Sequence, residues 1–239
     1  TGVLPGGLNV QRVAQLLYNR RHIDERPETR ENRIVCAYAF AASEQNADCK
    51  TIVTAPTCGS CAVVPSVLLY MQEKKGFSDE EILRALATGG LIGNIVKQNA
   101  SISGAEAGCQ AEIGTAAAMA AGALTFLQGG TTRQIMQAAA FALKNMLGLT
   151  CDPVGGLVEV PCIKRNVAGV VNAISAAQLA MAGIVSAISP DDTIDSMRRI
   201  GNELPVCLKE TGMGGLAVTE SAKKIMKKML NVTEMLKID

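Results

Sequence analysis

The sequence of 239 residues contains no tryptophan, a single histidine and only 3% aromatic residues, although 48% of its residues are hydrophobic. Its core must therefore consist chiefly of alanine, leucine, isoleucine, valine and methionine. Side chains of this size allow helices to pack closely against one another. The composition thus favours a helical core over one that is organised around large aromatic rings.

An excess of charge is also lacking, because 23 basic and 22 acidic residues leave a net charge of +1. Proteins that bind nucleic acid or anionic membranes through their general charge need a broad basic surface, which this sequence does not provide. Low net charge combined with high hydrophobicity also excludes intrinsic disorder. We therefore expect a folded protein that has no nucleic-acid partner.

Signals for export and for membrane insertion are missing as well. Residues 1–7 contain no basic segment followed by an apolar run, so we expect no signal peptide, a cytoplasmic location and reduced thiols. The uncharged segment 167–189 is long enough to cross a bilayer. Because it contains Asn172 and Gln178 and has no flanking aromatic residues, we predict a buried helix and no membrane partner.

The dominant hydrophobic period is helical. Apolar residues recur at helical spacing from Ile34 to Ala42, and Ser78 begins a capping box that ends with Glu81. Strand signals are limited to the short segments 51–53 and 157–160, each of which is soon followed by proline. We predict one compact all-α domain over residues 1–239. Further helices are expected at 10–19, 62–73, 107–127, 166–188, 192–200 and 219–230, and from a cap at Thr132 to Gly148.

Three segments between these helices are dense in small polar residues, namely 54–61, 99–106 and 150–156. Loops that carry hydroxyl groups and free backbone groups between apolar helices suit a small polar ligand. Ordinary turn chemistry is the alternative for any one of these loops taken alone.

The closest pair among the eight cysteines is Cys58 and Cys61, which fits either a redox dithiol or half of a zinc site. A zinc site would need a second close pair or histidine ligands, and the only histidine is His22. The sequence therefore leaves the role of this pair open.

Cys109, Cys151 and Cys162 lie next to glycine, proline or loops rather than within apolar helical stripes. Their spacing is no compact metal motif, but thiolate-rich sites with few histidines select iron–sulfur clusters or zinc. Isolated cysteines such as Cys36 and Cys207 are usually small buried hydrophobic residues.

Two long segments, 99–110 (NASISGAEAGCQ) and 149–166 (LTCDPVGGLVEVPCIKRN), resemble the catalytic alpha chain of the iron–sulfur-dependent L-serine dehydratases. Residues 54–57 and 214–218 also match the pattern of that family. The matching motifs follow the order of the family from about Asn32 to about Glu220.

This resemblance implies a helical catalytic domain that converts L-serine into pyruvate and ammonia. It implies that Cys109, Cys151 and Cys162 hold a [4Fe–4S] cluster in which one iron has no protein thiolate. It also implies a smaller beta domain or beta subunit as a partner, and we expect a homo- or hetero-oligomer. Because the chain does not begin with methionine, we expect it to be part of a longer protein or one subunit of an alpha/beta enzyme.

The elimination of water from serine needs a Lewis acid at the hydroxyl group and a base at Cα, and an iron with a free position can supply the first. Asn99, Ser101 and Ser103, with backbone N–H groups near Gly104, are candidate donors to the substrate carboxylate. The matching loop adds Thr54 and Thr57 as candidate substrate-binding residues.

Lys97 and Arg165 are the nearest positive charges to these segments in the sequence. Arg165 is a further candidate for substrate binding. Lys97 and Glu106 are candidates for the catalytic base. The alternative is that a residue of the beta domain supplies the base.

The sequence departs from the family at 58–61, where Cys-Gly-Ser-Cys stands in place of Asn-Gly and small residues. A lyase of the same family that releases sulfide from L-cysteine is therefore one alternative, and a non-catalytic helical scaffold with structural cysteines is another. A pyridoxal-phosphate enzyme is disfavoured, because the glycine pairs at 89–90 and 129–130 end helices rather than follow strands.

Overall fold

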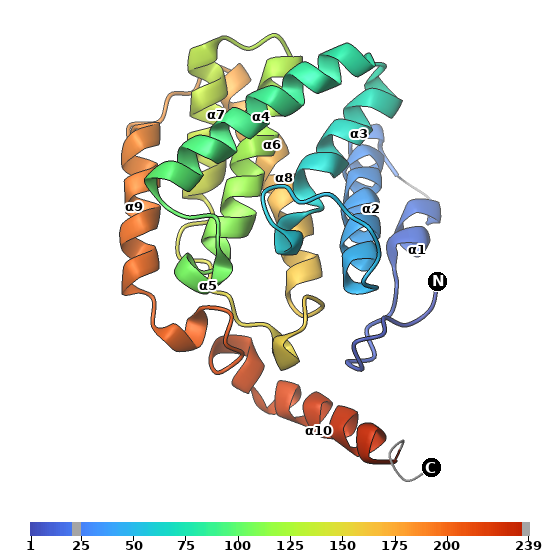
Figure 1. The fold of residues 1–239 in the computed structure, drawn as a ribbon. Coiled ribbons are helices and arrows are strands. Elements are labelled where there is room, and N and C mark those ends of the chain that lie inside the picture. The colour runs from blue at the N-terminus through green and yellow to red at the C-terminus, as the bar shows by residue number, and fades with distance from the viewer. Residues whose placement is uncertain (21–24, 236–239) are drawn as a thin grey trace.

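Helix α6 (Thr115–Leu127) lies at the centre of the fold, and all of its residues from Thr115 to Thr125 are buried. A helix that is buried on every side needs neighbours all round. Figure 1 shows these neighbours around α6, and the residue contacts agree. They are α3 (Val63–Lys75), α4 (Asp79–Asn99), α7 (Thr132–Lys144) and α8 (Cys162–Met181).

The computed structural model describes residues 1–20 and 25–235, and within these residues it contains no strand. The predicted all-α fold is therefore confirmed. The other α-helices are α1 (Ala14–Asn19), α2 (Pro27–Ala47), α5 (Gly104–Ala107), α9 (Pro190–Glu203) and α10 (Glu220–Met235). Short 3₁₀ turns are η1 (Cys58–Ser60), η3 (Val154–Gly156), η4 (Val206–Leu208) and η5 (Gly215–Val218), and η2 (Gln110–Gly114) is a π-helix.

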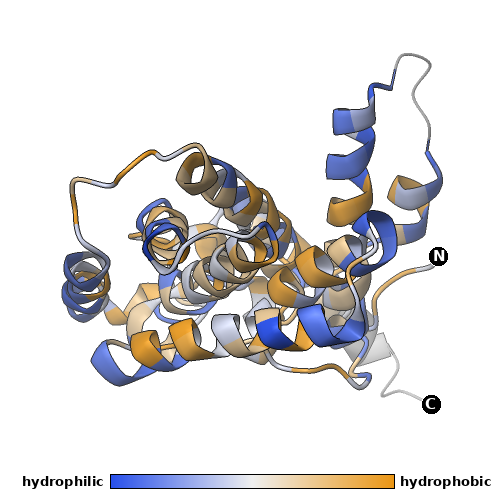
Figure 2. Ribbon diagram, turned by 90° about the horizontal axis from the view of Figure 1, so that it is seen from above, coloured by the Kyte–Doolittle hydropathy of each residue, from blue (hydrophilic) through white to orange (hydrophobic). Residues whose placement is uncertain are grey.

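Small residues allow α4 and α6 to approach closely. A Cβ atom added to Gly89 of α4 would lie 3.1 Å from the backbone carbonyl oxygen of Met119 in α6. The same atom on Gly90 would meet nothing within 4 Å. Seen from above, the hydrophobic segments gather in the interior and the hydrophilic ones lie mainly at the periphery (Figure 2).

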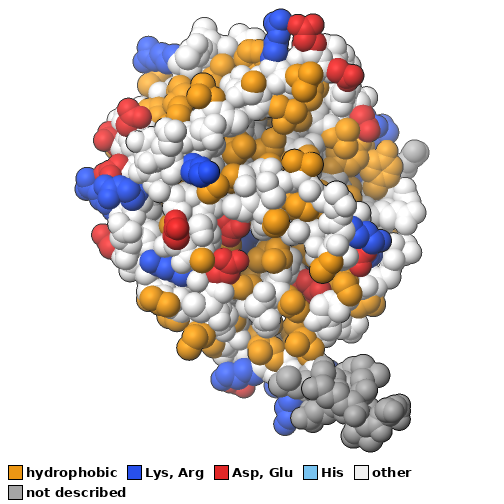
Figure 3. All heavy atoms as spheres, viewed as in Figure 1, with side chains coloured by type: hydrophobic (Ala, Val, Ile, Leu, Met, Phe, Trp, Pro, Cys, Tyr) orange, Lys and Arg blue, Asp and Glu red, His pale blue; other side chains and the backbone are white. Residues whose placement is uncertain are grey.

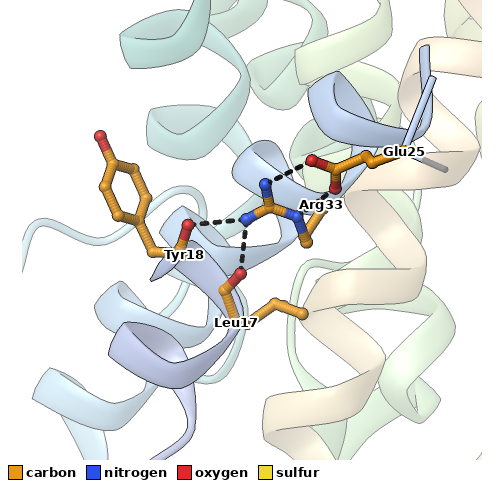
Figure 4. Close-up of polar contacts among 4 residues, drawn as sticks. All are labelled: Leu17, Tyr18, Glu25 and Arg33. Carbon is orange, nitrogen blue, oxygen red and sulfur yellow. Dashed lines mark hydrogen bonds and ion pairs between the residues drawn. The ribbon is translucent and has the colours of Figure 1, made fainter. Parts of the chain in front are cut away.

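Arg33 in α2 joins the end of α1 to the bundle. Its guanidinium donates to both oxygens of Glu25, at 2.5 and 2.9 Å, and to the carbonyl oxygens of Leu17 and Tyr18, at 2.7 and 2.6 Å (Figure 4). The last two carbonyls are among those that the end of a short helix leaves without an intrahelical partner. One buried side chain therefore satisfies the C-terminus of α1 and pairs with a carboxylate.

Several predicted boundaries need correction. Residues 107–127 form no continuous helix, because Gly108 has a φ of 79° after α5 and the π-helix η2 precedes α6. The weak strand signals at 51–53 and 157–160 correspond to no strand in the structure, in agreement with the all-α prediction. The helix predicted at 166–188 begins earlier, at Cys162, and ends earlier, at Met181, since Gly183 adopts a φ of 82°.

The capping signals are partly correct. The capping box of Ser78 and Glu81 is present, as predicted. The cap of α7 is Thr131 rather than Thr132, with Gln134 completing the box, and this helix ends at Lys144 instead of Gly148. The first helix begins at Ala14 rather than at residue 10.

The surface of the face seen in Figure 1 carries hydrophobic side chains in small groups, interspersed with charged ones (Figure 3). In the described part of the chain, no helix combines the length and the apolar character that a membrane span requires. His22, the only histidine, lies outside the described residues.

The contact at Gly89 leads to a prediction for stability. Gly90→Ala should raise the free energy of unfolding by about 0.5–1 kcal/mol, because alanine favours a helix and its methyl group meets nothing. Gly89→Ala should instead lower it by about 1–3 kcal/mol, because the methyl group presses on the backbone of a packed helix. Urea unfolding of both variants measures the difference, and equal effects would contradict the close contact between α4 and α6.

Candidate functional site

Two of the three predicted cluster ligands lie together with a carboxylate. The sulfur atoms of Cys109 and Cys151 and a carboxylate oxygen of Glu112 all lie within 4.8 Å of one another, and all three residues are buried. Cys109 and Glu112 come from the segment between α5 and α6, and Cys151 comes from the loop after α7. This group of three residues is called the Cys–Glu group below.

The backbone around Cys109 is held by a buried amide. Gln110 is 0% exposed, and its side chain donates to the carbonyl oxygens of Ala107 and Met197 and accepts from the N–H of Gly148. The π-helix η2 that begins at Gln110 turns Glu112 toward the cysteines. Single π turns of this kind are frequent at functional sites.

Cys151 is fixed from the other side by residues at the end of the 3₁₀ turn η4 and just after it. Its N–H donates to the carbonyl oxygen of Leu208 at 2.8 Å, and its carbonyl oxygen accepts from the N–H of Glu210 at 2.8 Å. The two bonds form an isolated parallel bridge with Lys209. A residue more than fifty positions away thus sets the position of this thiol.

Cys162 is the first residue of α8, and it is buried. It lies outside the 4.8 Å group, but it is near enough for its charge to interact with those of Cys109 and Glu112. Asn166, one turn further along α8, donates to the carbonyl oxygens of Cys162 and Gly59 and accepts from the N–H of Ala62. This side chain therefore joins the start of α8 to the loop 54–61.

Arg165 brings a positive charge to the cysteines. It donates to Cys109 Sγ at 3.7 Å and to the carbonyl oxygen of Thr150 at 2.7 Å, and it pairs with Asp152 at 2.8 Å. The second oxygen of Asp152 accepts from the N–H of Leu216 at 2.8 Å. The matching motif at 214–218 thus positions Arg165 through Asp152.

Glu112 is enclosed by the two loops that were predicted to bind substrate. Thr57 donates its hydroxyl to Glu112 Oε2 at 2.5 Å. A Cβ atom on Gly59 would lie 2.7 Å from Oε2, and a Cβ atom on Gly104 would overlap Oε1 and lie 3.2 Å from Cys151 Sγ. Burial raises the pKa of Glu112 above the ordinary glutamate value, although the bond from Thr57 opposes this.

The thiols differ in their readiness to ionise. The Cys151 thiol donates to Cys109, which lowers the pKa of Cys109 and raises that of Cys151. Burial raises the pKa of Cys162 to about 12. Burial lowers the pKa of Arg165, but Cys109 and Asp152 outweigh it, so the net shift is upward and the guanidinium remains charged. The thiolate form is therefore most accessible at Cys109, beside the arginine.

Other predicted residues lie further from the Cys–Glu group. Ser101 donates to Glu106 at 2.5 Å and accepts from the N–H of Ser103 at 3.0 Å, so these residues form a closed turn before α5. Asn99 is exposed and donates to the carbonyl oxygen of Ile95 in its own helix. Lys97 is also exposed, in the last turn of α4.

Thr54 is exposed, in contrast to Thr57 in the same loop. The role of the close cysteine pair stays open, since Cys58 is exposed and Cys61 is buried. Burial raises the pKa of Cys61 to about 11, with a further contribution from Cys58. Neither cysteine belongs to a possible metal-binding group of three or more among the described residues.

Sequence reasoning missed Glu112, Asp152 and Asn166. A signal for Glu112 was present, because it is the only charged residue between Ala107 and Leu127. Asp152 and Asn166 lie within the motif that carries the cysteines, but their roles depend on contacts with distant segments.

The donor set fits an iron–sulfur group. Two buried thiols, Cys109 and Cys151, lie together, a third at Cys162 is close enough to interact with the charge of Cys109, and the Arg165 guanidinium lies beside Cys109 to balance negative charge. Clusters are held by cysteine thiolates, and hydrogen bonds to sulfur tune them. The backbones of Gly59 and Gly104 lie so close to the Glu112 carboxylate that a side chain at either position would collide with it.

A family model described as "Serine dehydratase alpha chain" matches residues 1–217. The chain is 51% identical to a probable L-serine dehydratase alpha chain of Bacillus subtilis, over 80% of this chain and 64% of that relative. It is 45% identical to an L-serine dehydratase of Streptomyces coelicolor, over 91% of this chain and 48% of the relative. A probable alpha chain of Latilactobacillus sakei is 46% identical over 76% of this chain and 87% of the relative. The chain thus spans about half to two-thirds of the length of the first two relatives.

The contacts of Asn166 lead to a second prediction. Asn166→Ala removes three hydrogen bonds to backbone groups, two of them buried, so the free energy of unfolding should fall by about 2–4 kcal/mol. Asn94→Ala, at an exposed position in α4, is the matched control and should change it by less than about 0.5 kcal/mol. Urea unfolding measures both variants. A small effect at Asn166 would mean that its hydrogen bonds between α8 and the loop 54–61 contribute little to the free energy of unfolding.

Proposed function

Since the chain belongs to the serine dehydratase alpha chain family, we propose that it catalyses the [4Fe–4S]-dependent conversion of L-serine into pyruvate and ammonia. The observation that carries the proposal is the buried Cys–Glu group, with Cys162 and Arg165 beside it. We propose that the chain acts in the cytoplasm, together with a beta domain or beta subunit and as part of an oligomer.

In this proposal Cys109, Cys151 and Cys162 hold the cluster. When bound, the cluster supplies a Lewis acid for the departing hydroxyl group of serine through the iron that has no protein thiolate. Arg165 balances the charge of the thiolates, because it donates to Cys109 and is itself anchored by Asp152.

The remaining residues bind and orient the substrate. Overall, a proton leaves Cα and the hydroxyl group leaves Cβ, and the resulting enamine tautomerises and is hydrolysed to pyruvate and ammonia. Ser101 and Ser103 are proposed to donate to the substrate carboxylate, since their turn is adjacent to Gly104 at the Cys–Glu group. Thr57 holds Glu112 on the opposite side.

Candidates for the base remain Glu106, which accepts from Ser101, and Lys97 in the last turn of α4. Both are exposed, so a residue that closes over this surface is needed to exclude water around them. The proposed beta partner would supply that cover.

A related lyase that acts on L-cysteine is the second candidate. The observation that favours it is the departure from the family at Cys58, because the next residue, Gly59, lies directly against the Glu112 carboxylate. Parallel assays for pyruvate with L-serine and with L-cysteine decide between the two substrates, and sulfide release identifies the second reaction.

The ligand assignment predicts which cysteines are essential. Cys109→Ser, Cys151→Ser and Cys162→Ser should each lose bound iron, acid-labile sulfide and serine-dependent pyruvate formation, because a serine hydroxyl is not ionised at neutral pH. The measurement is iron and sulfide analysis of anaerobically purified protein, followed by the pyruvate assay.

The control for this experiment is Cys207→Ser, which changes an exposed cysteine and should leave both iron content and activity intact. Full cluster content in Cys151→Ser would contradict the assignment. A wild-type chain that binds no iron or sulfide would favour the non-catalytic scaffold.

A further inference from the structure

The segment 58–61, which departs from the family, places two cysteines at the ends of one tight turn. The 3₁₀ turn η1 spans Cys58–Ser60, and the N–H of Cys61 donates to the carbonyl oxygen of Cys58 at 3.2 Å. A bond of this kind between residues three apart brings their Cα atoms to within about 7 Å. Disulfides join Cα atoms that lie about 4.4–6.8 Å apart. The backbone therefore already holds the two cysteines at about the separation that a disulfide requires.

The turn is held in this shape by side chains of two helices. Asn46 in α2 donates to the carbonyl oxygen of Cys58 at 3.0 Å. Asn166 in α8 donates to the carbonyl oxygen of Gly59 at 2.7 Å and accepts from the N–H of Ala62 at 3.2 Å. Because the turn is fixed at both ends, the two thiols stay near each other, and the second competes well with thiols from solution.

The two thiols differ in their access to solvent. Cys58 is exposed, whereas Cys61 is 2% exposed and lies against α2, near the carbonyl oxygen of Ala42. Burial, together with the nearby charge of Cys58, raises the pKa of Cys61 to about 11. A reagent in solution therefore meets Cys58 first, while Cys61 is still a protonated thiol. Once the sulfur of Cys58 is bonded and uncharged, it no longer opposes the ionisation of Cys61.

Metal binding is the other use of a close cysteine pair. A zinc site needs four ligands as a rule, and in the described part of the chain no third cysteine, histidine or carboxylate forms a group with Cys58 and Cys61. The arrangement of one exposed and one shielded thiol in a fixed turn therefore favours redox chemistry over a metal site.

We propose that Cys58 and Cys61 form a thiol–disulfide exchange site for low-molecular-weight disulfides such as oxidised glutathione. The sulfur of Cys58 attacks one sulfur of the reagent, whose disulfide bond breaks and releases one glutathione. The sulfur of Cys61 then attacks that of Cys58 and releases the second glutathione. The reagent takes up two electrons and the two protons of the cysteines, and the chain gains one disulfide. This site goes beyond the proposed function and does not depend on it.

The test treats the anaerobically purified chain with oxidised glutathione, blocks the remaining thiols and maps the modified peptides by mass spectrometry. In the wild-type chain Cys58 and Cys61 should be joined to each other and carry no glutathione. In Cys61→Ser, Cys58 should retain one glutathione, because the second thiol is missing. In Cys58→Ser, Cys61 should stay free, because it is buried.

Cys207 is the matched control within the same molecule, since it is exposed like Cys58 but has no cysteine in its own turn. It should carry glutathione in all three proteins. Dithiothreitol should restore both thiols of the wild-type pair. Thermal unfolding of each variant accompanies the mapping, and the pairing found in the wild-type chain decides the question even if a variant unfolds.

A stable glutathione on Cys58 of the wild-type chain would overturn the inference, as would a pair that does not react. A disulfide between Cys58 and Cys49, an exposed cysteine just after α2, would also contradict it. So would modification of Cys109 or Cys151 before Cys58, because the reagent would then reach the proposed cluster ligands first. None of these outcomes bears on the iron analysis or the pyruvate assay of the untreated chain, which test the proposed function separately.

Discussion

The burial of α6 on every side is the constraint on which the rest of the structure depends. Its residues are small enough for α4, α7 and α8 to pack against it directly, and Gly89 marks a close approach to α4. Interiors of this kind are close-packed, so a helix in this position cannot shift without moving its neighbours. The segment that leads into α6 therefore has a fixed end point, and the site is built on that segment.

Polar groups concentrate in the segment before α6, because α6 itself is buried on every side and has no room for them. Around the π-helix η2, the side chains of Gln110, Asn166 and Asp152 bond to backbone groups of segments that are distant in the sequence. Buried polar groups are costly unless they are paired, so each of these side chains also fixes the position of the segment to which it bonds. The same network that completes the fold thus holds the three cysteines and Arg165 near one another.

The sequence predicts the fold class well because hydrophobic periodicity and capping chemistry are local. The box at Ser78 needs only the residues up to Glu81, and it is present in the structure. The break at Gly108 was missed because residues 107–127 have the composition of one continuous helix, and a positive φ depends on tertiary contacts. For the same reason Asn99 was placed in the site by its motif, whereas its side chain bonds to its own helix.

Glu112 is the clearest example of a site residue that could not be predicted from the sequence. Its isolation among small residues between Ala107 and Leu127 was visible, but a single carboxylate indicates nothing until its neighbours are known. The structure supplies those neighbours, namely a hydroxyl group, two thiols and two glycines, and none of them neutralises a negative charge. The backbone around it is held by bonds that do not involve this carboxylate, so these bonds alone do not account for its burial.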